Sequence, residues 1–175
     1  SGRPLLLQKV KDKVDAILYA WHPGTMAGPA ITDLLFGVES PSGKLPVTFP
    51  RVMGQIPIYY AHKNTGRPAT LDTIIHIDDI EAGAVQHSVG NTSFHLDTDD
   101  TPLYPFGYGR SYTEFSYSNL RLSSNSIAMG GSLTATIDLA NVGDYEAEEV
   151  VQLYIRDLVG SVTRPVRELK GFQRI

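Results

Sequence analysis

Five aspartates near the middle of the chain are the residues whose type and grouping could support acid–base chemistry. They are Asp78, Asp79, Asp97, Asp99 and Asp100. Two carboxyl groups that flank one bond can cleave a glycosidic linkage, because one protonates the leaving oxygen while the other attacks or activates water. All five fall in a long segment with loop character, where carboxylates are usually only solvated. We therefore interpret them as solvated surface groups.

A second group of side chains suits the binding of a sugar. Trp21 and His22 could stack on the apolar face of a pyranose, although a tryptophan that closes a buried strand is more often part of a core. His62, Asn64 and Arg67, in the sequence HKNTGRP, could form hydrogen bonds with hydroxyl groups. The same three residues would equally suit a turn at a contact between domains or subunits. Both interpretations stay open here.

The sequence predicts neither a metal site nor a cofactor. The chain has five histidines, which are His22, His62, His76, His87 and His95. None of them has the spacing of a known metal-binding motif, and the absence of cysteine rules out thiolate ligands and disulfides. Nucleophile-elbow, phosphate-loop and dinucleotide-binding glycine patterns are also missing. We interpret the histidines as scattered surface or structural residues.

Composition narrows the class of partner. The net charge of −4 and the isoelectric point near 5.7 provide no basic surface for nucleic acid. No apolar run approaches the roughly 20 residues needed to cross a bilayer. The 42% of hydrophobic residues is typical of a globular protein, so we predict neither a nucleic-acid nor a membrane partner.

Residues 102–115, with the sequence PLYPFGYGRSYTEF, separate two parts of different character. Two prolines and two glycines in this stretch fix an irregular backbone path. Its aromatic residues would bury a large apolar area: Tyr104, Phe106, Tyr108 and Tyr112. We predict that this aromatic joint packs between two domains.

Before the aromatic joint, the pattern predicts mixed helix and strand. Residues 5–14 suit a short amphipathic helix or a turn, and residues 16–21 suit a strand in a covered sheet. A helix is expected over residues 26–36, with Thr25 as its N-cap and Gly37 at its end. Residues 45–49 and 56–60 are expected to be short extended segments. Strand, turn and helix form the repeating unit of an α/β layer structure.

The stretch over residues 61–101 carries weak signals. It contains an apolar run at residues 71–80 and the acidic cluster near its end. A loop of this length inside a compact domain is usually functional or disordered. We predict a long excursion with one or two short strands.

After the aromatic joint, the pattern predicts strands only. Apolar residues alternate with polar ones over residues 133–139 and 151–155, so one face of each strand is expected to be buried. Residues near Leu120 and residues 166–175 complete four β segments. Four strands are too few to close a β-sandwich, and both ends of the chain look cut, so we expect an incomplete sandwich.

Several segments in order resemble glycoside hydrolase family 3, in its branch of bacterial β-glucosidases and β-xylosidases. The segments are WHPGTMAGPAITDLLFG, SGKLPVTFPR, GQIPIYY with NTGRP, PLYPFGYGRSYTEF, and VVQLYIRD with RPVRELKGF. The resemblance covers nearly the whole chain except residues 69–92. It implies that residues 1–101 are the last part of an α/β sandwich, that residues 102–115 are the joint, and that residues 116–175 begin a fibronectin type III-like domain.

The resemblance also implies where the chemistry lies. In such enzymes the nucleophilic aspartate lies on a barrel domain and the acid/base glutamate usually lies upstream in the sandwich, so no catalytic residue is assigned to this chain. The segments 62–67 and 94–97 are the expected contacts with substrate or with a second copy of the chain. The predicted binding residues are His62, Asn64, Arg67, Phe94, His95 and Asp97.

Two functional hypotheses follow. The first is a part of a retaining, exo-acting β-glucosidase-like enzyme that releases terminal β-linked sugars, with a β-glucoside or oligosaccharide as substrate. Its partners would be the remaining domains of the parent enzyme and a second copy in a homodimer, and the resemblance implies a periplasmic or extracellular location. The alternative is a non-catalytic module that binds carbohydrate or protein.

Overall fold

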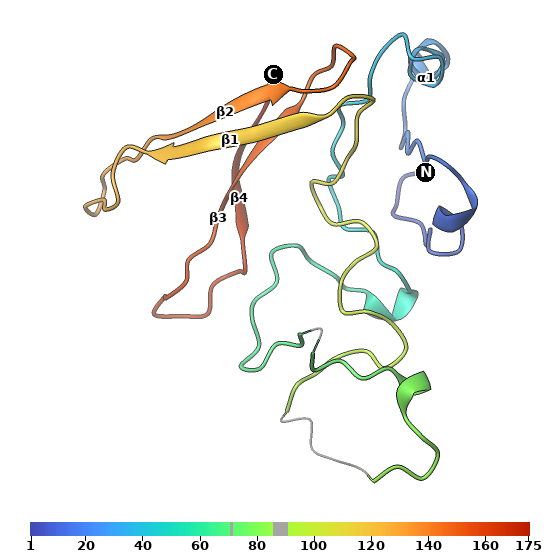
Figure 1. Cartoon of the computed structure of the whole chain (residues 1–175), viewed down its shortest axis with the longest axis vertical. Helices are drawn as coiled ribbons and strands as arrows, with labels where there is room; N and C mark the ends of the chain where they lie inside the picture. Colours follow the sequence, from blue (N-terminus) through green and yellow to red (C-terminus); the bar gives the residue numbers. More distant parts are fainter. Residues whose placement is uncertain (71, 86–90) are drawn as a thin grey trace.

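The computed structural model describes residues 1–70, 72–85 and 91–175. Its elements, in chain order, are the 3-10 turn η1 (Lys11–Lys13), the helix α1 (Ala27–Leu35), the 3-10 turns η2 (Met53–Gln55) and η3 (Ile77–Asp79), and the strands β1 (Phe115–Leu122), β2 (Ala135–Asn141), β3 (Val150–Ile155) and β4 (Glu168–Arg174). Figure 1 shows the strands at one end, with the described residues between 60 and 100 extending away from them. Little of the chain is helical, and the regular structure is mainly β.

Helix α1 is close to its predicted position. The sequence predicts its C-terminal end correctly but not its N-cap. The C-terminal end is as expected, because Gly37 adopts φ = +71° and the Val38 amide donates to the Asp33 carbonyl at 2.8 Å. The predicted N-cap is wrong, because the capping position is Met26 and no side chain caps it. The Ala27 amide instead donates to the Gly24 carbonyl at 3.3 Å, through the turn that precedes the helix.

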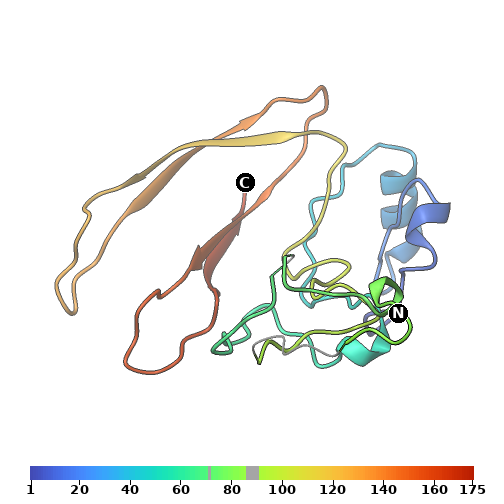
Figure 2. The same ribbon diagram turned by 60° about the horizontal axis from the view of Figure 1, so that its bottom comes forward.

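The four strands form two separate antiparallel pairs. Strand β1 pairs with β2, and β3 pairs with β4. Figure 2 shows the pairs as two separate ribbons joined by the connection between β2 and β3. The prediction of four β segments after the aromatic joint is confirmed, because alternating apolar residues and turn residues between them favour hairpins locally.

The predicted burial of one face of β2 is wrong. Every residue of this strand is exposed except Leu139, which is half-buried, and Ile137 is 38% exposed. Burying the apolar face of a sheet requires a second layer packed on it. Among the described residues, none provides that layer over β2.

The strand predicted over residues 16–21 is also wrong. The segment is not assigned to a strand, and Ile17 and Leu18 are 38% and 42% exposed. A strand needs a neighbour to pair with its backbone amides and carbonyls. No described residue of the first 70 offers such a neighbour. Residues 16–21 therefore have the composition of a covered strand but form no backbone ladder. Residues 5–14 form only the turn η1, the second of the two expected alternatives.

The two predicted segments before the excursion form no regular strand. Within residues 45–49, Phe49 forms an isolated antiparallel bridge with Tyr104 instead of a strand. Pro46 lacks an amide hydrogen, which interrupts the ladder. Residues 56–60 also have no strand assignment, because they pair with no neighbouring strand.

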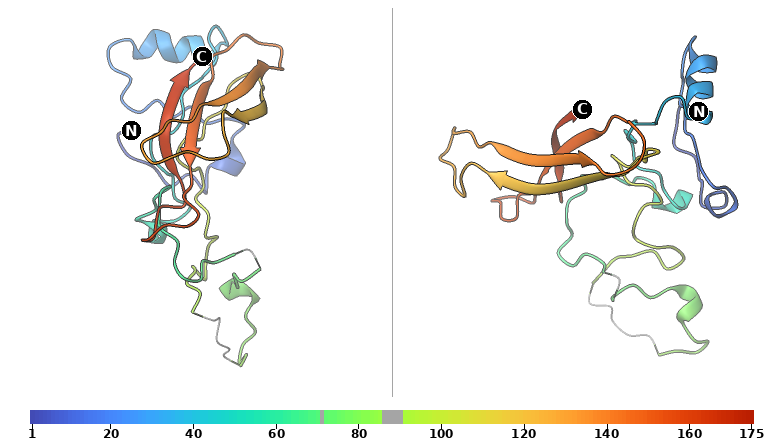
Figure 3. Two further views of the ribbon diagram at one scale, coloured as in Figure 1. Left: turned by 90° about the vertical axis from the view of Figure 1, so that its left-hand side faces the viewer. Right: turned by 45° about the horizontal axis from the view of Figure 1, so that its top comes forward.

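The excursion contains no regular strand within its described residues, so the prediction of short strands there is wrong for them. Its regular element is η3, and one isolated bridge joins Lys63 to Pro165. Leu71 and His87, which belong to the predicted apolar run and to the histidine set, lie outside the described residues. Figure 3 shows the described residues of the excursion extending away from the strands in both views.

The first part of the aromatic joint is packed, as predicted, whereas Tyr112 in its second part is 48% exposed. Residues 102–109 are half-buried. Backbone hydrogen bonds link Leu45 with Gly107 and Tyr108, and Phe49 with Tyr104, at 2.7–2.8 Å. From the other side, the Gln152 side-chain amide of β3 donates to the Gly107 carbonyl at 3.0 Å. The joint therefore contacts both the N-terminal half and the second hairpin.

Phe49 is the centre of the small core. It is 1% exposed and is the only fully buried large apolar side chain among the described residues. Its ring lies edge-on to those of Tyr19, Trp21 and Tyr104, with centroid distances of 4.9, 5.9 and 6.5 Å. These geometries are the favourable arrangement of aromatic quadrupoles.

Candidate carbohydrate-binding site

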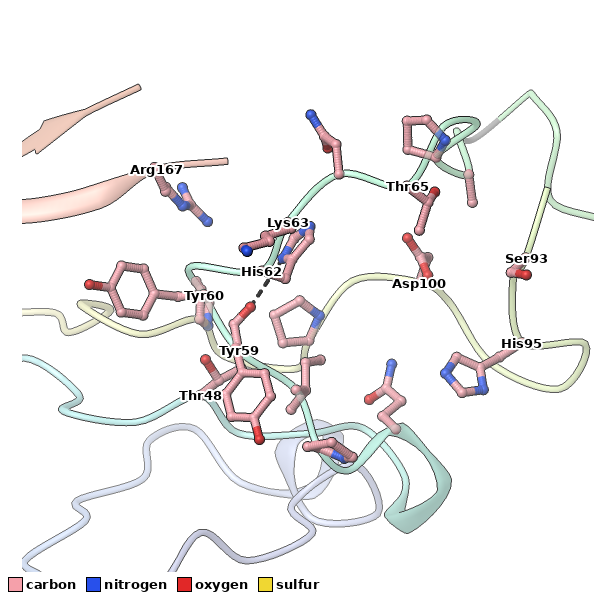
Figure 4. A pocket seen from close by; sticks show the side chains of 18 residues that line it. Thr48, Tyr59, Tyr60, His62, Lys63, Thr65, Ser93, His95, Asp100 and Arg167 are labelled. Carbon is pink, nitrogen blue, oxygen red and sulfur yellow. Dashed lines mark hydrogen bonds between the residues drawn. The ribbon is translucent and has the colours of Figure 1, made fainter. Parts of the chain in front are cut away.

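A hollow of about 300 Å³ lies beside the aromatic joint. Its walls come from Thr48, from residues 55–69, from residues 93–105 and from Arg167 just before β4. Figure 4 shows its side chains, with Arg167 at one end and His95 at the other. The site therefore combines segments that are distant in the sequence.

Aromatic stacking fixes the wall of the hollow nearest the strands. The Tyr60 ring stacks on Phe106 with a centroid distance of 4.1 Å, and it meets Tyr154 of β3 edge-on. The Tyr60 hydroxyl also accepts a hydrogen bond from the Leu169 amide at 3.4 Å. Contacts with the aromatic joint and with strands β3 and β4 therefore hold this wall in place.

Backbone pairing holds the next two residues of the wall. The His62 carbonyl accepts a hydrogen bond from the Val166 amide at 2.9 Å, beside the Lys63–Pro165 bridge. The His62 Nδ1 atom lies 3.1 Å from the Tyr59 carbonyl oxygen (Figure 4). A carbonyl can only accept, so Nδ1 carries the hydrogen and Nε2 of the neutral ring is an acceptor. In this tautomer the Nε2 atom can accept a hydrogen bond from a hydroxyl group.

A buried glutamine supports the floor. Gln55 is 5% exposed, and its side-chain oxygen accepts from the Arg51 amide at 2.7 Å. Its side-chain nitrogen donates to the carbonyls of Asp99 and Thr101 at 2.8 and 3.3 Å. Gln55 therefore ties the end of the excursion to the turn η2.

The structure brings together three of the six predicted binding residues. His62, Asn64 and His95 line the hollow, although the last lies far from the first two in the sequence. Arg67, Phe94 and Asp97 belong to the same two segments but are not among the lining residues. Phe94 is half-buried, while Arg67 and Asp97 are exposed.

The aspartates singled out in the sequence lie at different positions relative to the hollow. Asp100 lines the hollow. Asp99 forms an ion pair with Arg51 at 3.4 Å, and its other carboxylate oxygen lies 3.6 Å from His76 Nε2. Asp78 and Asp79 lie in η3, outside the hollow.

The Trp21 ring packs on Tyr19 and Phe49, so the core interpretation of this tryptophan is the correct one.

Sequence reasoning missed several lining residues. Tyr59 is 66% exposed at the hollow, and Lys63 and Arg167 contribute two cations. Lys63 lies inside the HKNTGRP motif, so the motif contained the signal for it. Arg167 follows the isolated bridge at Pro165, and no local pattern in the sequence indicates that it reaches the site.

A largely buried ion pair beside the aromatic joint joins the two halves of the chain. Lys44 Nζ lies 2.9 Å from Glu149 Oε1, and the two side chains are 14% and 10% exposed. The same ammonium group donates to the Gly109 carbonyl at 3.0 Å. Burial raises the pKa of Tyr117 on β1 to about 12, with further contributions from the Glu149 charge and a hydrogen bond to Glu149.

The Tyr117 hydroxyl is expected to make stability fall at high pH. Although Tyr117 is 45% exposed as a residue, its hydroxyl lies beside the buried Glu149 carboxylate. The folded pKa is above the ordinary value of 10.0, so this contribution to stability is complete below pH 10 and is lost as pH rises through about 12.

We expect the free energy of unfolding of Tyr117→Phe to fall less between pH 10 and about pH 12 than that of the unmodified chain. Tyr145→Phe, at a residue that is 65% exposed, is the control and should retain the full fall. Identical pH profiles for all three proteins would contradict this assignment.

The described ranges contain neither a metal-binding cluster nor a membrane-spanning helix. No group of three or more histidine, aspartate or glutamate side chains there is placed to hold a metal ion. No helix there is long and apolar enough to cross a membrane.

Comparison with known proteins defines the class of this fold. Residues 1–112 match the glycosyl hydrolase family 3 C-terminal domain, and residues 149–175 match a fibronectin type III-like domain. The chain belongs to glycosyl hydrolase family 3. This confirms the resemblance seen in the sequence segments.

Individual relatives narrow the comparison. The chain is 45% identical over its full length to a periplasmic beta-glucosidase of Salmonella typhimurium, and 38% identical to a beta-xylosidase of Formosa agariphila. It covers 21% of each of these proteins, so it spans about a fifth of the length of the curated relatives it matches. A crystal structure of a beta-glucosidase from Listeria innocua in complex with glucose is 40% identical, with a TM-score of 0.83. That alignment covers 99% of this chain and 22% of the Listeria protein.

Proposed function

We propose that this chain is part of a retaining, exo-acting β-glucosidase-like glycoside hydrolase that releases terminal β-linked sugars. In this proposal the chain forms and supports one wall of the sugar-binding pocket. The observation that carries it is the hollow beside the aromatic joint, where His62, Asn64 and His95 converge with the exposed ring of Tyr59. An aromatic face surrounded by hydrogen-bonding groups suits a pyranose.

The carboxylates at the hollow support a non-catalytic role for this part. Retaining hydrolysis needs two carboxyl groups about 5–5.5 Å apart across the scissile bond. Among the described residues, Asp100 is the only carboxylate that lines the hollow. One carboxyl group cannot serve as both nucleophile and acid/base, so both catalytic carboxylates are proposed to lie on other segments of the parent polypeptide.

We also propose a domain assignment. Residues 1–101 form the last part of an α/β sandwich, residues 102–115 form the aromatic joint, and residues 116–175 begin a fibronectin type III-like β-sandwich. The exposed apolar residues of β2 and of residues 16–21 support this assignment, because other segments of a complete sandwich would cover them. The relative from Salmonella typhimurium favours a periplasmic or extracellular location.

Within the binding site, we propose two roles. His62, Asn64 and His95 contact the substrate directly, because they line the hollow. Arg67, Phe94 and Asp97 hold the two lining segments in place or contact a second copy of the chain. The direct role predicts effects on substrate affinity, whereas the supporting role predicts effects on stability.

The test uses the complete parent polypeptide and an aryl β-glucoside. Asn64→Ala is expected to raise KM about three- to tenfold with little change in kcat, because one hydrogen bond to substrate contributes about 0.5–1.5 kcal/mol. Asn125→Ala, at an exposed position between β1 and β2, is the matched control and should leave KM unchanged. The isolated 175-residue chain is expected to show no turnover.

Other results would overturn the proposal. Turnover by the isolated chain would mean that it contains the catalytic carboxylates, and its aspartates would then be replaced first. Binding of the glucoside by a parent polypeptide that does not hydrolyse it would favour the non-catalytic binding module.

A further inference from the structure

Two cationic side chains lie at one end of the hollow. Lys63 and Arg167 both line it, and Figure 4 shows their charged ends at the same side, away from His95. The backbone fixes this arrangement, because the His62 carbonyl and the Val166 amide are hydrogen bonded beside the Lys63–Pro165 bridge. The pairing therefore brings the segment of Lys63 next to the segment that carries Arg167, although the two segments are distant in the sequence.

Two nearby cations, Arg164 and Lys170, form ion pairs with carboxylates, whereas among the described residues Lys63 and Arg167 do not. Arg164 has ion pairs with Asp157 at 3.9 Å and Glu168 at 3.5 Å, and Lys170 lies 3.4 Å from Glu168. Within the described part of the chain, no carboxylate lies within ion-pair distance of Lys63 or Arg167. Two like charges held close together without a counter-ion repel each other, and an anion bound between them would relieve that repulsion.

We propose that the Lys63–Arg167 end of the hollow binds the carboxylate of a uronic acid residue in an oligosaccharide substrate. This inference rests on the proposed function, and it adds a substrate class to that function. A guanidinium group binds a planar carboxylate through two parallel hydrogen bonds, and an ammonium group adds a point charge. The rest of the hollow, with His62, Asn64 and the Tyr59 ring, provides the contacts for the neutral sugar ring.

The remaining lining residues are consistent with one anionic group at this end. Asp100 is the carboxylate that lines the hollow, and Figure 4 shows it beside Thr65, separated from Arg167 by His62 and Lys63. A substrate carboxylate at the Asp100 end would meet a like charge, whereas at the Lys63–Arg167 end it would meet two opposite charges. The charge distribution therefore sets the orientation of an acidic sugar.

The test measures binding by calorimetry with the complete parent polypeptide. The two probes are a non-hydrolysable, sulfur-linked β-glucose disaccharide and the same disaccharide in which one glucose is replaced by glucuronic acid. We expect the acidic disaccharide to bind several-fold more tightly than the neutral one, with the difference shrinking at high salt. Lys63→Gln and Arg167→Gln should each weaken the acidic probe about tenfold and leave the neutral probe unchanged.

Matched variants and a second readout make the outcome decisive. Arg174→Gln removes the same charge from β4, at a residue already paired with Glu148, and should leave both affinities unchanged. Lys63→Arg keeps the charge and should keep the preference for the acidic probe. Equal losses for both probes, or no loss for either, would overturn the inference. Hydrolysis of the ordinary, oxygen-linked glucose disaccharide tests the proposed function separately, since the preference between the two sulfur-linked probes is measured by binding alone.

Discussion

Replacing Glu149 with alanine is expected to lower the free energy of unfolding by about 3 kcal/mol, as found when one partner of a buried ion pair is removed. The variant leaves the Lys44 ammonium group in a site where the side chain is only 14% exposed. It also removes the acceptor of the Tyr117 hydroxyl. The measurement is chemical denaturation of the variant and the unmodified protein under the same conditions.

The adjacent residue provides the control for this prediction. Glu148 pairs with Arg174 at 3.2 Å, but the two side chains are 61% and 59% exposed. Exposed ion pairs contribute about 0–1 kcal/mol, so Glu148→Ala should have a small effect. Because the two glutamates are consecutive, the comparison separates burial from local chain position.

A double replacement gives the sharper test. Lys44→Met with Glu149→Leu removes both charges and keeps apolar volume, which is often neutral or stabilising for a buried pair. We expect it to recover most of the stability lost in Glu149→Ala. Equal small effects of Glu148→Ala and Glu149→Ala would show that the pair between the two halves of the chain is not effectively buried.

Phe49→Ala is expected to have the largest effect of a single core replacement, about 3–5 kcal/mol. The ring is 1% exposed and contacts three other aromatic rings, so its removal leaves a cavity as well as exposing apolar surface. The Trp21 ring lies 5.9 Å from it, centroid to centroid. Tryptophan fluorescence should therefore report the loss of packing together with the shift of the denaturation midpoint.

Phe36→Ala is the matched control, because the same side chain is 81% exposed at the end of α1. Exposed replacements usually change stability by less than about 0.5 kcal/mol. If both phenylalanine variants lost similar amounts, the small core around Phe49 would not be the centre of stability in this part of the molecule.

The sequence by itself determined the elements that depend on local preferences. Alternation of apolar and polar residues predicted β2 and β3, since side chains on a strand repeat every two residues. Gly37 predicted the end of α1, because only a residue that accepts positive φ closes the helix there without strain. The ordered segments also identified the family, because their residues and order could be compared directly.

Only the tertiary structure decided which distant residues meet. Residues 16–21 have the composition of a covered strand, but pairing depends on a neighbour, and no described residue supplies one. Lys44 and Glu149 are 105 positions apart, and Arg167 reaches the hollow through the backbone bridge beside Lys63. No local pattern encodes such contacts, because they depend on how the aromatic joint and the second hairpin pack. The sequence therefore determined the elements and the family, while the packing determined the ion pair between the halves and the charge at the hollow.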